Sequence, residues 1–273
     1  MRFATTARAA TTLALTAAVL ACADVPAPTA PPGPRFVTNG TPTGSAYGNV
    51  GALLIDEDAD GQIDFLCSGG LIAETVFLTA GHCVDFGPDA VYYVTFAPDV
   101  TPLPADLIQA TAVVANPAFD PRTLFGDLAV VLLPEGSTAG ITPLELPPEG
   151  YLDGLASEGS LRDRTSFINV GYGDEVVRPG QPLFLFDGLR EAAPSPLQAL
   201  TPNFLGLQTV ASATGEGGAC FGDSGSPKFV EGDPTLIVAV TSWGGRICQG
   251  TSWAYRLDIP EARAFLDDFV TLR

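Results

Sequence analysis

The stretch LTAGHC, from Leu78 to Cys83, contains the only histidine in a chain of 273 residues. Imidazole has an ordinary pKa near neutrality, which suits it to act as a general base. A lone histidine is more often a packed or solvated residue than a catalyst. A catalytic role for His82 therefore requires partners elsewhere in the sequence.

A glycine-rich stretch supplies the first partner. The segment GGACFGDSGSP, from Gly217 to Pro227, places Ser224 between Asp223 and Gly225. A serine hydroxyl becomes an effective nucleophile when a neighbouring base takes its proton. His82 and Ser224 are therefore a candidate base and nucleophile.

A third stretch supplies a carboxylate. The segment FGDLAVVLL, from Phe125 to Leu133, places Asp127 at the head of a very apolar run. Burying a charge there is costly unless the carboxylate has a partner. Asp127 is the candidate for the acid that orients the histidine, in preference to Asp99 and Asp120, which we expect in solvated turns.

Together the three stretches resemble the motifs of the chymotrypsin-fold serine proteases. In that family the base lies in Thr-Ala-Gly/Ala-His-Cys, the acid heads an Asp-Ile/Leu-Ala-Leu strand, and the nucleophile lies in Gly-Asp-Ser-Gly-Gly/Ser-Pro. The resemblance runs from about Val37 to the C-terminal end, and the order His82, Asp127, Ser224 differs from that of the α/β-hydrolases. It implies a serine endopeptidase, of a secreted bacterial type, that acts on proteins or peptides through these three residues.

The resemblance also implies two disulfides. They would join Cys67 to Cys83 and Cys220 to Cys248, and so hold the loops of the base and of the nucleophile. A bridge that closes a loop of this size contributes about 3 kcal/mol on the entropic model. Cys22 would then be the one cysteine without a partner.

Further residues are implied to contact the substrate. The backbone N–H groups of Gly222 and Ser224 would form the oxyanion hole that stabilises the tetrahedral intermediate. The stretch Ser242-Trp243-Gly244 resembles the strand that pairs with the substrate backbone, and Ser242 would also support Asp127.

Specificity is implied by the residues of the primary pocket. Gly218 takes the floor position where family members that cut after Arg or Lys carry an aspartate. Gly244 would leave the mouth open, and Ser252 would face the lumen. We expect a preference for uncharged side chains, with aromatic or large aliphatic ones favoured over small ones.

The remaining pattern indicates an all-β fold. Short apolar runs alternate with Gly- and Pro-rich turns from Val50 to Leu257, as in barrels and sandwiches. The resemblance specifies two six-stranded antiparallel β-barrels, in a protease domain over residues 36–273 with lobes at about 36–140 and 141–273. The end of the chain predicts an α-helix, with Asp258 as its cap and Pro260 in its first turn.

The N-terminal residues predict export. Two arginines precede an apolar run over residues 9–21 that is too short to span a bilayer, so residues 1–21 are expected to be a signal peptide. Residues 22–35 form a Pro-rich linker or propeptide. Cys22 follows Val-Leu-Ala as in a lipoprotein box. It is either the lipid-bearing terminus of a cell-envelope protein or part of the cleavage site of a secreted one.

Activation is where the sequence departs from the family pattern. Family zymogens are cut before Ile-Val-Gly-Gly, and the freed amine pairs with the aspartate before the nucleophile, here Asp223. The corresponding stretch is PRFVTNGTP, from Pro34 to Pro42. The functional terminus is either Phe36, after cleavage at Arg35, or Val37, unless the chain matures in another way.

Charge excludes one class of partner. The chain has 13 basic and 31 acidic residues, a formal net charge of −18 and a pI near 4.1. Nucleic-acid phosphates need Lys and Arg, so we expect no nucleic-acid partner. No cofactor motif is present, so no cofactor is expected to be required, and a monomer is expected.

An acidic stretch leaves two alternatives for metal binding. The segment DEDADGQID matches positions 1, 3, 5, 6 and 9 of an EF-hand calcium loop at Asp56, Asp58, Asp60, Gly61 and Asp64. Position 12 would be Cys67 instead of Glu, and the segment joins two predicted strands instead of helices. It is either a structural calcium site or a solvated acidic turn.

Two other functional classes are alternatives to an enzyme. A protease-like domain can lose activity and become a binding module, although no residue of the triad is missing here. An acidic, lipid-anchored calcium-binding surface protein would explain Cys22 and the acidic stretch. It would leave His82 and Ser224 unexplained.

Overall fold

The computed structural model describes residues 36–162, 165–176, 184–245 and 247–272. The expected signal peptide, the Pro-rich linker and Cys22 lie outside these residues. The chain divides into two units, residues 1–33 and 34–273, and everything below concerns the second. No helix within the described ranges has the length and apolar character needed to cross a membrane.

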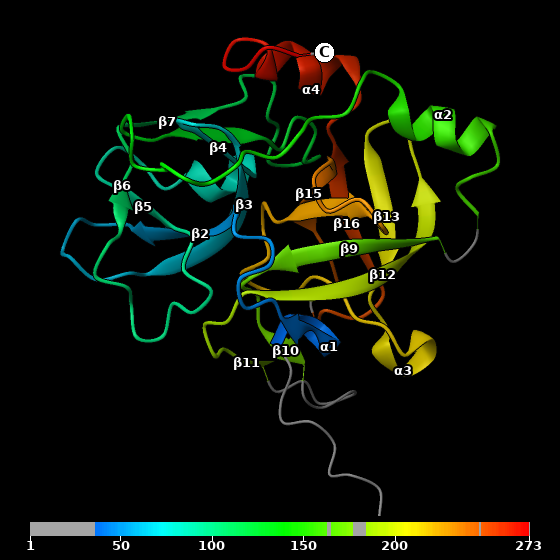
Figure 1. Cartoon of the computed structure of the whole chain (residues 1–273), viewed down its shortest axis with the longest axis horizontal. Helices are drawn as coiled ribbons and strands as arrows, with labels where there is room; N and C mark the ends of the chain where they lie inside the picture. Colours follow the sequence, from blue (N-terminus) through cyan, green and yellow to red (C-terminus); the bar gives the residue numbers. More distant parts are fainter. Residues whose placement is uncertain (1–35, 163–164, 177–183, 246, 273) are drawn as a thin grey trace, which may run out of the picture. The chain divides into compact units, whose positions relative to one another are not determined.

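The second unit is built mainly from β-strands (Figure 1). The strands are β1 (Thr41–Pro42), β2 (Val50–Asp56), β3 (Phe65–Ala73), β4 (Val76–Thr79), β5 (Val91–Thr95), β6 (Ile108–Gln109), β7 (Ala112–Ala115), β8 (Ala129–Leu132), β9 (Ser166–Gly171), β10 (Glu175–Val176), β11 (Phe184–Leu185), β12 (Glu191–Leu200), β13 (Phe204–Gln208), β14 (Pro227–Val230), β15 (Ile237–Trp243) and β16 (Thr251–Arg256). The helices are α1 (Phe36–Asn39), the 3-10 turn η1 (Gly81–Val84), α2 (Tyr151–Ser157), α3 (Ala211–Thr214) and α4 (Pro260–Leu266).

The first sheet is antiparallel, with strand order β6-β5-β2-β3-β4-β8-β7. Its two edge strands are separated in sequence by only Ala110 and Thr111. The Ala110 N–H donates to Tyr92 of β5 and the Thr111 N–H donates to Leu132 of β8, so this bend brings the edges together and the sheet curls. Its inner face carries apolar side chains that include Leu53, Ile55, Leu71, Phe77, Val94 and Val131.

The second sheet closes into a barrel. Strands β12, β13, β16, β15, β14 and β9 follow one another, and β9 pairs with β12 again to complete the ring. Strand β1 adds to the outside of β12. The first sheet ends at Leu132 and β9 begins at Ser166, so the lobe boundary expected at residues 140–141 falls in the connection between the two sheets.

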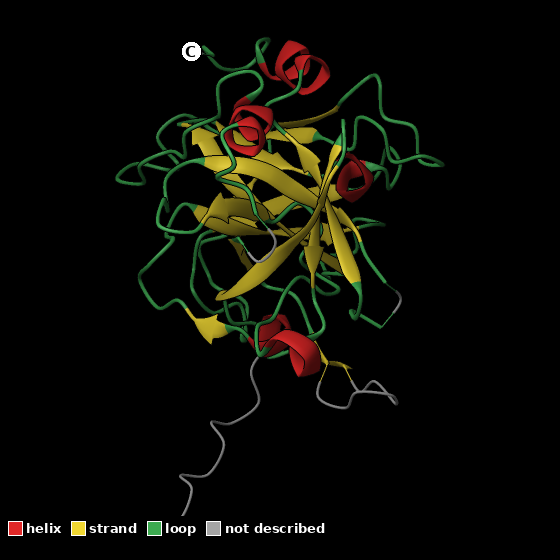
Figure 2. Cartoon of the chain, turned by 90° about the vertical axis from the view of Figure 1, so that its right-hand side faces the viewer, coloured by secondary structure: helices red, strands yellow, loops and turns green. Residues whose placement is uncertain are grey.

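The two sheets share a core that positions the site. A cluster of buried side chains joins Val50, Leu78 and Val130 of the first sheet to Val170, Val240 and Tyr255 of the second. The view coloured by secondary structure shows the strands in the interior and the helices at the periphery (Figure 2).

The all-β chymotrypsin-like architecture with a C-terminal helix is confirmed. The capping role expected for Asp258 is wrong. Ile259 is the N-cap residue of α4, without a side-chain cap, and the buried Asp258 carboxylate instead pairs with Arg256 at 2.8 Å and accepts from the Leu152 N–H. A buried tertiary partner has outweighed the local capping preference.

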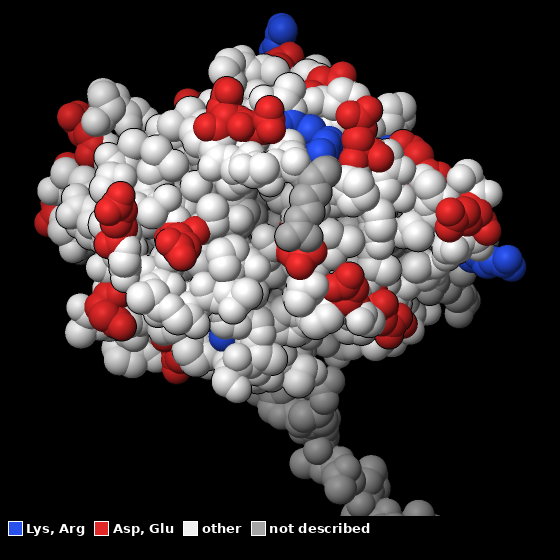
Figure 3. All heavy atoms as spheres, turned by 45° about the horizontal axis from the view of Figure 1, so that its top comes forward, with Lys and Arg blue, Asp and Glu red and all other residues white. Residues whose placement is uncertain are grey.

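The surface reflects the acidic composition. Figure 3 shows acidic side chains scattered over one face, with few basic ones between them. Two of the arginines, Arg190 and Arg256, are instead almost fully buried.

Candidate active site

The histidine motif and the aspartate motif meet at the carboxylate of Asp127. The Nδ1 atom of His82 lies 2.9 Å from Oδ2 and 3.1 Å from Oδ1 of Asp127, and the backbone N–H of His82 donates to Oδ1 at 2.9 Å. His82 lies in η1, directly after β4, and Asp127 precedes β8, which pairs with β4. Pairing of these neighbouring strands therefore brings together two residues 45 positions apart.

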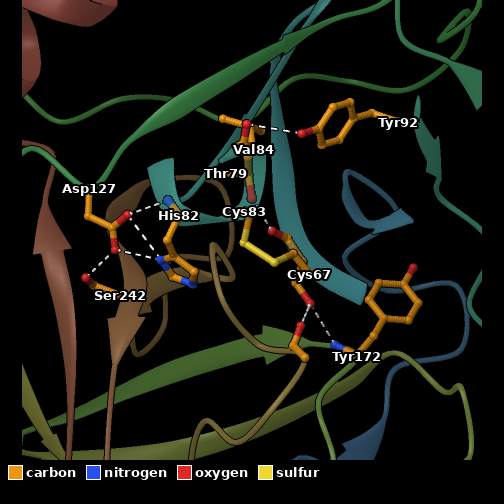
Figure 4. Close-up of a disulfide and its surroundings, with 11 residues drawn as sticks. Cys67, Thr79, His82, Cys83, Val84, Tyr92, Asp127, Tyr172 and Ser242 are labelled. Carbon is orange, nitrogen blue, oxygen red and sulfur yellow. Dashed lines mark hydrogen bonds and ion pairs between the residues drawn. A yellow bond between two sulfur atoms is a disulfide. The ribbon is translucent and has the colours of Figure 1, made fainter. Parts of the chain in front are cut away.

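A third residue completes the surroundings of this carboxylate. The hydroxyl of Ser242, in β15 of the second sheet, donates to Oδ2 of Asp127 at 2.5 Å (Figure 4). Asp127 is fully buried, whereas the His82 side chain is 33% exposed. The three donors offset the cost of burying the Asp127 charge.

Local sequence allows this close approach. A Cβ atom at Gly81 would lie 3.3 Å from Oδ1 of Asp127 and 3.2 Å from the Phe119 ring, so glycine leaves room for the carboxylate. The predicted disulfide between Cys67 and Cys83 is present and ties η1 to β3. The loop that carries His82 is therefore held by the Asp127 carboxylate and by the disulfide.

The turn that carries Ser224 is held by the carboxylate of the preceding residue. The Asp223 carboxylate is fully buried and accepts from the Cys220 N–H at 2.9 Å and the Gly173 N–H at 3.1 Å. Gly222 has a φ of 90°, a conformation that favours glycine. The hydroxyl of Ser68 donates to the Gly222 carbonyl at 2.9 Å. These bonds fix the backbone on both sides of Gly222.

Ser224 lies in the wall of a cavity that also contains Ser242. The cavity has a volume of about 240 Å³, and its lining includes Ala219, Cys220, Phe221, Gly222, Ser224, Ser242, Trp243, Gly244, Cys248 and Ser252. Ser242 thus lines the cavity and also bonds the Asp127 carboxylate. Within the described part of the chain, no hydrogen bond joins the Ser224 hydroxyl to His82.

The described residues that line this cavity carry no charged side chain. Arg246, which follows the lining residue Gly245, lies outside the described residues. Trp243 is 44% exposed and stacks on Trp253 with ring centroids 5.6 Å apart. The predicted disulfide between Cys220 and Cys248 is present at one side of the cavity.

Gly218 is placed beside the lining residue Ala219, but it is not itself among the lining residues. Its backbone pairs with Thr38, and its N–H donates to the Thr38 carbonyl at 3.0 Å. A Cβ atom there would lie 2.5 Å from Thr209 and 3.0 Å from the Ser195 hydroxyl. The glycine therefore serves close backbone packing.

Among the residues that the structure describes, two groups of side chains lie close enough to share a metal ion. Cys67, His82 and Cys83 form one, but both sulfurs are consumed by the disulfide. The other consists of Asp56, Asp58 and Asp64, whose carboxylate oxygens lie within 4.8 Å of one another. Asp56 also accepts from the backbone N–H groups of the loop itself. A calcium loop and an acidic turn share this geometry.

One charged residue near the site was not predicted from the sequence. Lys228 is fully buried, and its Nζ atom donates to Asn169, Thr241 and, at 3.1 Å, the hydroxyl of Ser226. Burial lowers the pKa of Lys228 and raises the pKa of Asp223, and the opposite charge of each partner opposes these shifts. The only signal in the sequence is a lysine that interrupts an apolar run directly after the GDSGSP stretch.

Comparisons of sequence find similarity to serine proteases. A sequence model of the trypsin family matches residues 50–183. Serine protease 56 of Homo sapiens is 32% identical over 194 residues, which cover 66% of this chain and 30% of that protein. Collagenase of Hypoderma lineatum is 28% identical over 189 residues, 65% of each chain. The matched part of this chain thus spans less than two thirds of either relative. Both relatives are eukaryotic, so they give no support to the expected bacterial type.

Solved structures share the fold. HL collagenase superposes with a TM-score of 0.61 at 21% identity, over 81% of this chain and 94% of that chain. Human heparin binding protein superposes with a TM-score of 0.62 at 18% identity, over 85% and 96% of the two chains. The family match, the relatives and the fold thus agree that the matched region is a domain of the trypsin family of chymotrypsin-fold serine proteases.

Proposed function

We propose that the protein is a serine endopeptidase that hydrolyses peptide bonds through His82, Asp127 and Ser224. The observation that carries the proposal is the buried Asp127 carboxylate, which bonds both His82 Nδ1 and the Ser242 hydroxyl. With Nδ1 engaged, the other ring nitrogen of His82 is left to act on the nucleophile.

The proposed reaction is acyl transfer in two steps. Ser224 Oγ attacks the peptide carbonyl carbon while His82 Nε2 takes its proton, and His82 then gives that proton to the leaving amine. Water repeats the sequence on the acyl-enzyme. Asp127 orients the ring and stabilises its positive charge without taking the proton. In enzymes without substrate the bond between nucleophile and base is often unformed, and it tightens in the substrate complex.

The N–H groups of Gly222 and Ser224 are proposed as the oxyanion hole. The positive φ of Gly222 and the bonds of Asp223 to the backbone support this role, because they fix the turn before the substrate arrives. A Cβ atom at Gly222 would lie 3.1 Å from both Gly173 and the Leu66 side chain. A substitution there would therefore displace the turn.

The cavity beside Ser224 is proposed as the primary specificity pocket. Its uncharged lining supports a preference for uncharged side chains, and the absence of a side chain at Gly244 leaves room for aromatic or large aliphatic ones. Peptides that differ only at the residue before the cleaved bond test this. Fastest cleavage after Arg or Lys would contradict it.

We propose that the chain matures by a cut before Val37. Val37 is fully buried and its nitrogen lies 3.1 Å from the Gly173 carbonyl, while the Gly173 N–H bonds Asp223. A new amine at this nitrogen would therefore lie beside Gly173, whose own N–H donates to the Asp223 carboxylate. N-terminal sequencing of the active protein should give Val37. A start at Phe36 would overturn this choice.

Export and anchoring are proposed from the N-terminal sequence. Residues 1–21 would be removed as a signal peptide, and a lipid on Cys22 would hold the linker at the cell envelope until the cut before Val37 releases the domain. Mass spectrometry of the full-length product tests this, because an unmodified Cys22 would favour a secreted precursor. We also propose that the domain is monomeric and that the acidic stretch is a calcium site.

The alternative functions receive less support. One of the proteins that share the fold is named for binding heparin, so the fold by itself does not decide between a catalyst and a binding module. The test is labelling with a fluorophosphonate probe, which reacts only with an activated serine. Wild type should be labelled, whereas Ser224→Ala and His82→Ala should not. Absence of labelling in correctly processed wild type would favour the binding module.

A further inference from the structure

A buried cation lies close to the turn that carries the proposed nucleophile. Lys228 follows Ser224 by four residues, in β14, and its side chain is fully buried. Its Nζ atom donates to the amide oxygen of Asn169, to the hydroxyl of Thr241 and, at 3.1 Å, to the hydroxyl of Ser226. These three acceptors are neutral, so they satisfy the donors of the ammonium group without cancelling its charge. The charge therefore acts on a carboxylate nearby.

Ser226 connects this ammonium group to Asp223. The Ser226 hydroxyl accepts from Lys228, and the Ser226 backbone N–H donates to the Asp223 carbonyl at 2.8 Å. A Cβ atom at Gly171 would overlap Oδ1 of Asp223 and would lie 3.1 Å from Cβ of Ser226. Ser226 thus contacts the ammonium group and lies close to the carboxylate of the residue before the nucleophile.

The two buried charges stabilise each other. Burial raises the pKa of Asp223 and lowers the pKa of Lys228, and the attraction between the two charges opposes both shifts. The interior of the barrel screens this attraction much less than solvent would. Asp174 acts in the opposite direction, because its negative charge raises the pKa of Asp223 further. Among the described residues, Lys228 is thus the cation that favours the ionised form of Asp223.

The turn is already formed in a chain whose bond before Val37 is uncut. Phe36 and Val37 are joined in α1, so the Val37 nitrogen is an uncharged peptide N–H, which donates to the Gly173 carbonyl. Gly222 nevertheless has a φ of 90°. The Asp223 carboxylate also accepts from the Gly173 N–H already. A charged amine at Val37 is therefore not needed to place this carboxylate.

We propose that Lys228 is an internal counter-charge that keeps the Ser224 turn formed before maturation, so that the intact precursor already has a basal peptidase activity. This inference rests on the proposed endopeptidase function and on the proposed cut before Val37. Lys228 is a positioning residue, because it acts on the turn through Asp223 and Ser226. The new amine at Val37 would be a second cation, which raises the activity above the basal level.

The test compares the intact chain with the processed chain. The first is full-length protein whose mass shows that the bond before Val37 is uncut, and the second starts at Val37. Both are labelled with the fluorophosphonate probe, which also stops self-cleavage as it reacts. We expect the intact chain to be labelled at most about tenfold more slowly, because a counter-charge is already in place. A larger deficit would overturn the proposal.

Two variants test whether the charge is the cause. Lys228→Gln keeps an N–H donor for Asn169 but removes the charge, whereas Lys228→Met removes both. In the intact chain each should lower the labelling rate per folded molecule by about 100-fold or more, because Asp223 is left without a counter-charge. The processed chain should lose much less, since its amine at Val37 supplies a cation. Equal losses in the two forms would overturn the proposal, even if only Lys228→Gln folds.

Arg256→Met is the matched control. Arg256 is another buried cation, and its guanidinium bonds Asp153, Asp258 and the carbonyls of Thr201 and Pro202. Its loss should change the labelling rate per folded molecule by the same factor in the intact and the processed chain. A loss confined to the intact chain in this variant as well would overturn the assignment to Lys228.

Processed wild type separates this inference from the proposed function. If the processed chain is labelled and the intact chain is not, the inference alone is overturned. If neither form is labelled, the endopeptidase function is overturned and the inference with it. Labelling of both forms, with a loss in the intact Lys228 variants alone, is the result that supports the proposal.

Discussion

The hydroxyl of Ser242 lies 2.5 Å from Oδ2 of Asp127, the same oxygen that lies 2.9 Å from Nδ1 of His82 (Figure 4). Asp127 belongs to the first sheet and Ser242 to the second, so this bond ties the base and its acid to the strand beside the substrate cavity. The bond from Ser242 helps to fix the orientation of the carboxylate, and the His82 ring bonds this carboxylate through Nδ1.

Asp127→Asn should lower kcat by about 10,000-fold with little change in the fold. The amide would present an N–H where a carboxylate oxygen now accepts from His82, which disfavours the tautomer that the base requires. Steady-state kinetics on a peptide or ester measures the loss, and thermal unfolding checks the fold. A loss below tenfold would mean that Asp127 does not orient the base.

Ser242→Ala should have a smaller effect, about 10- to 100-fold on kcat/KM. A hydrogen bond to a charged group contributes about 1.5–3 kcal/mol, and the substitution removes one of the two described donors to Oδ2 of the buried carboxylate. Ser137→Ala is the matched control, because the Ser137 hydroxyl bonds a backbone carbonyl in an exposed turn. Equal kinetics in the two variants would contradict the role of Ser242.

The sequence predicted those parts of the site that depend on short motifs. Asp127 was identifiable because a lone carboxylate at the head of an apolar strand requires a partner, and the structure provides His82 and Ser242. Both disulfides were predicted from cysteines within the same motifs and are confirmed. Residues within a motif keep their local geometry, so such a prediction needs little knowledge of the tertiary structure.

Features that depend on tertiary contacts were not predictable in this way. Asp258 looked like a helix cap, but its partner Arg256 is a buried arginine whose burial no local rule indicates. Lysine is rarely buried, and only the closure of the barrel against Asn169 and Thr241 encloses Lys228 in β14.

Asp174→Asn should stabilise the protein, and increasingly so as the pH rises from about 4 to about 6. Burial raises the pKa of Asp174 to about 6, so the folded protein holds this proton more tightly than the unfolded chain. The stability that protonation provides is full below the ordinary value of 3.8 and is lost as the pH passes through about 6. Because the Asp174 side chain is only partly buried, solvent screening limits the gain in the free energy of unfolding to about 1 kcal/mol.

Thermal unfolding of wild type and Asp174→Asn at several pH values measures this difference. Asp233→Asn is a control of opposite sign. Hydrogen bonds from Thr235 lower the pKa of Asp233, so its carboxylate stabilises the fold above the ordinary pKa and that contribution is lost as the pH falls. A difference between wild type and Asp174→Asn that is constant with pH would contradict the prediction.

Lys228→Met should lower the rate at which the fluorophosphonate probe labels Ser224 by a larger factor than it lowers the fraction of folded protein. The substitution removes the donor to Asn169 and Thr241 and leaves Asp223 a buried charge without its cationic neighbour. Removing one of two buried opposite charges leaves the other without its counter-charge, which destabilises the fold. Because the Asp223 carboxylate bonds the Cys220 and Gly173 N–H groups, a strained Asp223 also disturbs the turn that carries Ser224.

A double-mutant cycle isolates the interaction of the two charges. Lys228→Met, Asp223→Asn and the double variant are compared by denaturant unfolding and by the rate of fluorophosphonate labelling. Neutralising both groups removes the unpaired charge that each single variant creates, so the double variant should lose less stability than the sum of the single losses. Strictly additive losses would mean that Lys228 only packs in the barrel. A labelling rate that falls in Lys228→Met and is partly restored in the double variant would then tie this buried pair to the geometry of the nucleophile turn.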